Sequence, residues 1–255
     1  MKSKKDILKL ALKLRNENKI YDRNDPLAED IFKGSIERFI VIAEKLQGHT
    51  KILDVGAGNG ILLSLLSEMG HECYAVDYED FSDMYPLQYS KIKEVKLCNV
   101  EVDDLPYEDE KFDAVTCCQA LEHFVHSHLH PVKEMKRVLK PGGILELDVP
   151  NVACYRNRSR LLRGKNIGGD YVKSYLHAEP INYKGHTIFP LRHNREFTKK
   201  ELDILFKEAG FTSFETSFLR SRRYREGTEK FKNILTSLKD AIPSLRKSLI
   251  GFAIK

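Results

Sequence analysis

Three closely spaced glycines and an acid provide the strongest chemical signal in the sequence. Gly56, Gly58 and Gly60 stand between a short apolar run and a helical pattern that begins at Ile61. Glycine permits positive φ and carries no Cβ to block a ligand, and the first turn of a helix presents unpaired N–H groups. Asp54, two residues before the first glycine, could place a carboxylate beside an ammonium group. The expected chemistry is binding of a nucleotide-like cofactor that has an ammonium group and no pyrophosphate.

A second acid follows about 20 residues beyond the glycines. Asp77 ends an apolar run that starts at Cys73 and is typical of a buried strand. A carboxylate at this place can accept hydrogen bonds from both hydroxyls of a ribose. The ring of Tyr78, the next residue, could lie against an adenine. Both side chains therefore indicate a ligand that contains a nucleoside.

Four motifs, in this order, resemble those of the class I S-adenosylmethionine-dependent methyltransferases, close to the type 11 and type 23 groups. The first is D-x-G-x-G-x-G at residues 54–60, and the second joins Leu-Pro-Tyr at 105–107 to Phe-Asp-Ala-Val at 112–115. The third is Leu-Glu-His at 121–123, and the fourth is Arg-Val-Leu-Lys-Pro-Gly-Gly at 137–143. The stretch that carries the resemblance, residues 51–151, covers about two fifths of the chain.

The resemblance implies a Rossmann-like, doubly wound α/β fold, with a seven-stranded sheet whose last strand is antiparallel to its neighbours. It also implies S-adenosyl-L-methionine as the cofactor. Aligned on Pro106, Glu101 takes the place of an acid, usually Asp in the family, that contacts the adenine amino group, with the backbone of Val102 beside it. The candidate cofactor-binding residues are Asp54, Gly56, Ala57, Gly58, Gly60, Asp77, Tyr78, Glu101, Val102 and Gln119.

Methyl transfer from a sulfonium is an in-line displacement, so such an enzyme must position the two reactants and, for some acceptors, remove a proton. Three histidines are the candidate catalytic bases: His123, His186 and His193. For each of them the alternative is a structural or surface role. The histidines at 126, 128 and 130 have no carboxylate in a facial-triad arrangement, so no metal is expected.

The methyl acceptor stays open at the level of sequence. The favoured acceptor is a small molecule, a glycan or a lipid-linked intermediate, methylated at oxygen. RNA is the alternative acceptor, because basic residues alternate with tyrosines at 155–165 and 220–225. A third hypothesis is a non-catalytic subunit that keeps the cofactor pocket. Methylation of adenine or cytosine in nucleic acid is disfavoured, since the Asn/Asp-Pro-Pro-Tyr and Pro-Cys motifs of those enzymes are missing.

Composition indicates an ordinary globular protein. The 255 residues are 42% hydrophobic and 31% charged, with a formal net charge of +5. Five cysteines have neither zinc spacing nor the pairing of a small secreted scaffold. No apolar run reaches the roughly 20 residues that a bilayer requires, and the N-terminus lacks the pattern of a signal peptide. A cytoplasmic enzyme without a transmembrane segment is therefore expected.

The chain divides into an N-terminal helical lid at 1–48 and a cofactor-binding domain at 49–255. Helices are expected at 3–15, from 26 to Gly48, at 123–139 with an irregular start around 126–131, from Thr198 to 209 and at 228–241. The later strands are expected at 144–149, 211–219 and 249–254. Residues 151–197 lack a clear period and are rich in Arg, Tyr and His. We expect them to form an acceptor-binding insertion, in which Arg192 and Arg195 would bind an anionic acceptor through paired hydrogen bonds.

Overall fold

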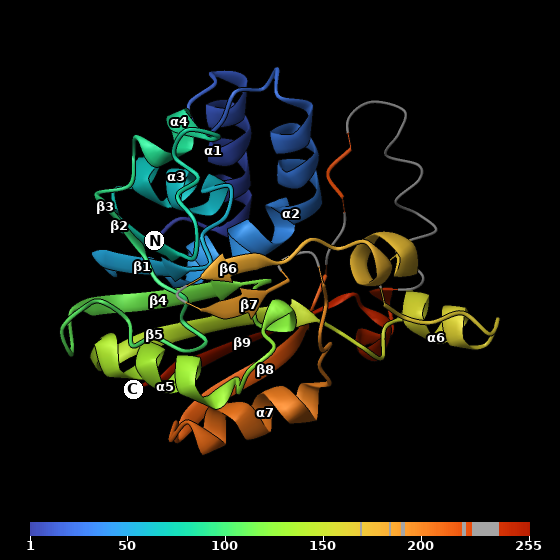
Figure 1. Cartoon of the computed structure of the whole chain (residues 1–255). Helices are drawn as coiled ribbons and strands as arrows, with labels where there is room; N and C mark the ends of the chain where they lie inside the picture. The colour runs from blue at the N-terminus through green and yellow to red at the C-terminus, as the bar shows by residue number, and fades with distance from the viewer. Residues whose placement is uncertain (169, 184, 190–191, 221–222, 226–239) are drawn as a thin grey trace.

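A seven-stranded sheet organises the computed structural model, which describes residues 1–168, 170–183, 185–189, 192–220, 223–225 and 240–255. Its strand order is β3-β2-β1-β4-β5-β9-β8 (Figure 1). All neighbouring pairs from β3 to β5 are parallel, and β9 is antiparallel to both β5 and β8. The strands are β1 (Lys51–Val55), β2 (Glu72–Asp77), β3 (Glu94–Leu97), β4 (Phe112–Cys118), β5 (Leu139–Pro150), β8 (Ser213–Leu219) and β9 (Ser248–Ile254). The expected doubly wound fold with a reversed last strand is confirmed.

Helices cover both faces of the sheet, because the central strands are apolar on both sides. Ile52 and Leu53, neighbours on β1, are fully buried in two different core clusters. Figure 1 shows α1, α2 and α3 over one face and α5 and α7 over the other. The helices are α1 (Lys4–Asn16), α2 (Pro26–Lys45), α3 (Ile61–Glu68), α4 (Pro86–Tyr89), α5 (Leu129–Val138) and α7 (Lys199–Glu208).

The helix starts follow the capping residues in the sequence. Ser3 accepts a hydrogen bond from Asp6 N in a capping box, Asp25 caps α2 before Pro26, and Thr198 forms the expected capping box with Glu201. Among the described residues, no helix is long and apolar enough to cross a membrane.

Two expected boundaries are wrong. The helix expected from His123 begins at Leu129, after a 3₁₀ turn at Leu121–His123. The intervening N–H groups of Val125 and His126 donate to the Glu101 carboxylate at 2.7 and 2.9 Å, so they are not available to a helix. β5 begins at Leu139 rather than Ile144, because the Pro-Gly-Gly turn is accommodated as an irregularity in its pairing with β4. The helix expected at 228–241 falls almost wholly outside the described residues.

The insertion at 151–197 contains short elements of its own. They are α6 (Tyr155–Leu161), a π turn at Val172–Leu176 and a hairpin of β6 (Ile181–Tyr183) and β7 (His186–Ile188). A bridge between Asn151 and Phe197 closes its base. A 3₁₀ turn at Pro243–Leu245 precedes β9.

Candidate active site

A cavity of about 190 Å³ opens where the parallel strands end. Its walls come from the loop after β1, the end of β2, the loops after β3 and β4, and Ile188 on β7. Ligands of open α/β sheets bind at this carboxyl edge. The insertion therefore contributes a wall of the same cavity as the glycine loop.

The three glycines of the loop have different structural roles. A Cβ on Gly56, where φ is 79°, would lie 2.9 Å from the Ala120 Cβ, so a side chain would collide with the loop after β4. Gly60, with φ 68°, is the N-cap of α3, and a Cβ there would lie 3.2 Å from atoms of Gln88 and Tyr89. A Cβ on Gly58, with φ 51°, would have no protein atom within 4 Å, and this residue lines the cavity.

Asp77 is held in place by the glycine loop. Its Oδ2 accepts a hydrogen bond from Gly58 N at 2.9 Å and its Oδ1 accepts one from Tyr78 N at 2.8 Å. Burial raises the pKa of this carboxyl to about 6. Asp77 and Tyr78 both line the cavity, and the Tyr78 ring packs edge-on against Phe81.

Four candidate cofactor residues do not line the cavity: Gly60, described above, and Asp54, Ala57 and Val102. Asp54 is buried beneath the loop and accepts a hydrogen bond from Thr116 Oγ1 at 2.7 Å, and burial raises its pKa to about 7. Ala57 is buried in the core that includes α3. The N–H of Val102, expected beside the adenine, donates to the Asn99 carbonyl at 3.0 Å.

Glu101 and Gln119 do line the cavity. The Glu101 carboxylate is already an acceptor for two N–H groups of the loop after β4, as described above. Gln119 has φ 51°, and its side-chain Nε2 donates to Asp148 Oδ1 at 2.6 Å. Sequence reasoning missed the other residues that complete the lining: Val55, Val76, Phe81, Cys98, Asn99, Val100, Ala120, Phe124 and Ile188. For the lining residues outside the insertion, the one available signal was their position in or directly after a strand of the sheet.

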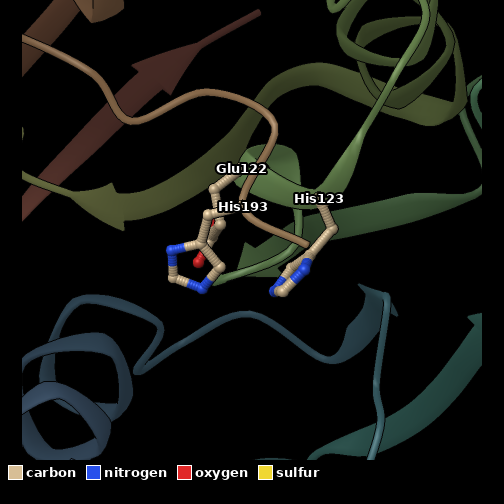
Figure 2. Close-up of side chains that lie close together, drawn as sticks. All are labelled: Glu122, His123 and His193. Atoms are coloured by element: carbon tan, nitrogen blue, oxygen red, sulfur yellow. The ribbon is translucent and has the colours of Figure 1, made fainter. Parts of the chain in front are cut away.

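Figure 2 shows the side chains of Glu122, His123 and His193 close together. One ligand-type atom of each lies within 4.8 Å of the others, and the two imidazole rings meet edge to face at 4.8 Å. His123 lines the cavity, and its Nδ1 lies 2.9 Å from the carbonyl oxygen of Arg192. The insertion thus brings one histidine of the cluster and orients the other.

Protonation in this cluster is set by its surroundings. Burial raises the pKa of the Glu122 carboxyl to about 8, and its Oε2 is buried without a hydrogen-bond partner in the part of the chain that the structure describes. The pKa of His193 is raised, mainly by its contact with Glu196, whose Oε1 lies 3.6 Å from the His193 Nδ1. The cluster could move a proton, and its three donor atoms are also of the kind that hold a divalent metal.

The remaining candidate residues are His186, Arg192 and Arg195. His186 lies on β7, and its side chain is outside the description. Arg192 Nε donates to the Ser174 carbonyl at 2.8 Å, and Arg195 forms an ion pair with Glu201. Neither arginine lines the cavity. Their expected grip on the acceptor finds no direct geometric support, because each guanidinium is occupied within the protein.

The sheet order, the glycine loop and the acid at the end of β2 define an α/β protein that binds a cofactor containing a nucleoside. The sequence profile of a family described as "Methyltransferase domain" matches residues 53–147. A demethylmenaquinone methyltransferase of Staphylococcus aureus (strain JH9) is 31% identical over 177 residues, covering 64% of this chain and 68% of the relative.

Solved structures agree in fold. A 1,6-didemethyltoxoflavin-N1-methyltransferase of Burkholderia thailandensis, solved with its substrate and S-adenosylhomocysteine, has a TM-score of 0.55 at 18% identity and covers 97% of this chain and 89% of its own. A chain from the complex of the Haloferax volcanii Trm112 activator with a methyltransferase has a TM-score of 0.61 at 14% identity, covering 91% of this chain and 94% of its own. The protein belongs to the class I S-adenosylmethionine-dependent methyltransferases.

The chain is thus a methyltransferase whose cofactor is S-adenosyl-L-methionine. The cavity fits the nucleoside half of this cofactor, since Gly58 leaves open space beside the Asp77 carboxylate and apolar residues line the far wall. Bound there, the cofactor supplies an electrophilic methyl group.

Proposed function

We propose that this enzyme methylates an oxygen atom of a small-molecule, glycan or lipid-linked acceptor. The names of two similar proteins support a compact acceptor, because demethylmenaquinone and didemethyltoxoflavin are small organic molecules. An acceptor hydroxyl becomes a competent nucleophile when a base removes its proton. The oxygen then forms a bond to the methyl carbon, and the electrons of the broken carbon–sulfur bond stay on sulfur.

The position of His123 carries the proposal. Its Nδ1 lies 2.9 Å from a carbonyl oxygen, which can only accept, so Nδ1 carries the hydrogen and Nε2 holds the lone pair in the neutral ring. This side chain also lines the cofactor cavity. We assign His123 as the base and His193 with Glu122 as the neighbours that share its proton. His186 stays a third candidate for this role.

We further propose that residues 151–197 cap the acceptor and that residues 1–48 form a lid. Two contacts from Asn194 support the cap: its N donates to the Glu122 carbonyl at 2.7 Å, and its Nδ2 donates to the His123 carbonyl at 2.6 Å. Arg192 and Arg195 would then contribute to acceptor binding by fixing the cap in place. The ion pair of Arg38, on α2, with Asp148 supports a lid that reaches the sheet edge.

We also propose which residues contact each part of the cofactor. We assign the ribose to Asp77, the adenine to Tyr78 and Glu101, and the close backbone approach to Gly56 and Gly58. Asp54, Ala57 and Gly60 support the glycine loop from behind, Val102 supports the loop after β3, and Gln119 faces the reacting end.

Incubation with radiolabelled cofactor and fractionated cell extract tests the acceptor class. We expect label in the small-molecule, glycan or lipid fraction, with bonds that have the base stability of a methyl ether. Label that ribonuclease releases would replace this proposal by RNA methylation. Absence of label from every fraction, with cofactor binding intact, would favour a non-catalytic subunit.

A further inference from the structure

A second cavity, of about 410 Å³, shares Gln119 with the cofactor cavity and has more cations than carboxylates among its lining residues. We call it the basic pocket. It lies between α2, the segment after β8 and the start of β9, and Gln119 lines both it and the cofactor cavity. The residues important here are Arg38, Gln119, Arg223, Arg225, Lys247 and Ser248.

Four cations line the basic pocket, and the carboxylate among its lining residues is that of Asp30. That carboxylate is already paired with Arg223. The guanidinium of Arg38 pairs with Asp148 through Nη1 and donates to Ser35 Oγ through Nη2 at 2.8 Å. Its Nε is buried and has no hydrogen-bond partner in the described part of the chain. The pocket therefore combines excess positive charge with a buried donor that an anion could satisfy.

The position of the basic pocket next to the cofactor cavity indicates which molecule would carry this anionic group. Gln119 stands between the two cavities, with its side chain fixed on Asp148, the same carboxylate oxygen that receives Arg38 Nη1. A molecule whose charged end occupied the basic pocket would direct its other end toward Gln119 and the cofactor cavity. Arg192 and Arg195 of the insertion, in contrast, are occupied by Ser174 and Glu201.

We propose that the basic pocket binds a phosphate or diphosphate group of the methyl acceptor. This inference rests on the proposed function, because it names the chemical class of that enzyme's acceptor. Arginine forks match the oxygens of a phosphate, and two or more of them give the pocket a preference for a multiply charged group.

Titration calorimetry with inorganic pyrophosphate tests the proposal without requiring turnover. The protein is first saturated with S-adenosylhomocysteine. We expect saturable binding to the wild type, and at least tenfold weaker binding to a variant with Arg225→Gln and Lys247→Gln. A control with Lys200→Gln and Lys207→Gln removes the same charge from exposed positions on α7 and should bind as the wild type does. If both variants lost pyrophosphate affinity equally, the loss would be an effect of net charge and the proposal would be overturned. Absence of pyrophosphate binding to the wild type would also overturn it.

The carboxylate of the cofactor's methionine end offers the same chemistry and is distinguished by a second titration. S-adenosylhomocysteine carries that end, and 5′-methylthioadenosine lacks it. If the pocket serves the acceptor, the Arg225→Gln, Lys247→Gln variant binds both nucleosides within about twofold of the wild type. Selective loss of S-adenosylhomocysteine affinity would assign the pocket to the cofactor. Pyrophosphate binding with no methyl transfer in any extract fraction would instead count against the proposed function alone.

Discussion

Arg38 Nη1, on α2, lies 2.9 Å from Oδ1 of Asp148, near the end of β5 and 110 residues away. The Asp148 side chain is completely buried, and Glu146, two residues earlier on the same strand, is buried as well. Burial, followed by the charge of Asp148, raises the pKa of Glu146 well above its usual range. The guanidinium of Arg38 therefore provides the positive charge beside two buried acids of β5, Glu146 and Asp148.

Replacing Arg38 by Met should lower the free energy of unfolding by about 3–5 kcal/mol, because it leaves a buried carboxylate without its cation. Asp148→Asn in the same chain should restore a large part of that loss. Urea unfolding of the two single variants and the double variant measures the coupling. Additive losses would show that the two side chains act independently.

Asp77→Ala should weaken S-adenosylhomocysteine binding by more than tenfold, since it removes charge-assisted bonds to the ribose worth about 1.5–3 kcal/mol each. Because the pKa of Asp77 in the free protein is about 6, wild-type affinity should fall as the pH decreases through 6 and level off above it. Calorimetry at several pH values checks both. The affinity of the Asp77→Ala variant should lack this pH dependence, and Asp80→Ala, which changes an exposed acid, should behave as the wild type.

Gly58→Ala and Gly142→Ala form a matched pair. Both glycines have positive φ, at 51° and 77°, and a Cβ on either would have no protein atom within 4 Å. Each substitution should cost about 1–2 kcal/mol of folding free energy through the left-handed backbone. Only Gly58→Ala should also reduce cofactor affinity, because its methyl group would enter the cavity. Equal affinities in the two variants would remove Gly58 from the cofactor site.

His123→Gln should reduce kcat by about 10²–10⁴, the range for loss of a general base, while cofactor affinity stays within about threefold. His177→Gln, at an exposed histidine of the insertion, is the control. The assay uses the extract fraction that accepts label. A chelator should leave the wild-type rate unchanged, and recovery of a chelated enzyme by added zinc or manganese would instead assign a metal to Glu122, His123 and His193.

Glu122→Gln should change stability in a pH-dependent way. The folded-state pKa of Glu122, about 8, lies above the unfolded value of about 4.3, so wild-type stability decreases as the pH rises through this interval. The amide cannot ionise and escapes that loss. The melting temperature of the variant relative to the wild type should therefore increase from pH 5 to pH 9 by at least about 2–4 °C. A constant difference across this range would mean that folding does not raise the pKa of Glu122.

The sequence predicted the fold well because its signals are local. Ser3, Asp25 and Thr198 start their helices by contacts within three residues, and the glycine loop joins a strand to the helix next to it. The boundary error at His123 arose from a distant cause, since Glu101 recruits two N–H groups that a helix would have used.

The site was predictable only where its residues follow the ends of strands. Asp77 and Gln119 could be placed on the cavity in this way. His193 reaches Glu122 through an irregular insertion, and Lys247 shares a pocket with Arg38 although 209 residues separate them. No periodicity encodes such long-range contacts. Residue type and proximity to His193 indicate Arg192 and Arg195 as candidates but do not reveal the groups that they contact.

The reversed strand β9 has a consequence for the order in which the protein matures on the ribosome. It lies between β5 and β8, and β8 pairs with no other described strand. While residues 248–254 are still inside the exit tunnel, β5 has an open edge and β8 has no partner. The nascent chain can close β1 to β5 early, but the outer part of the sheet must await the emergence of β9 from the tunnel, which makes this interval the one in which a chaperone would be most useful.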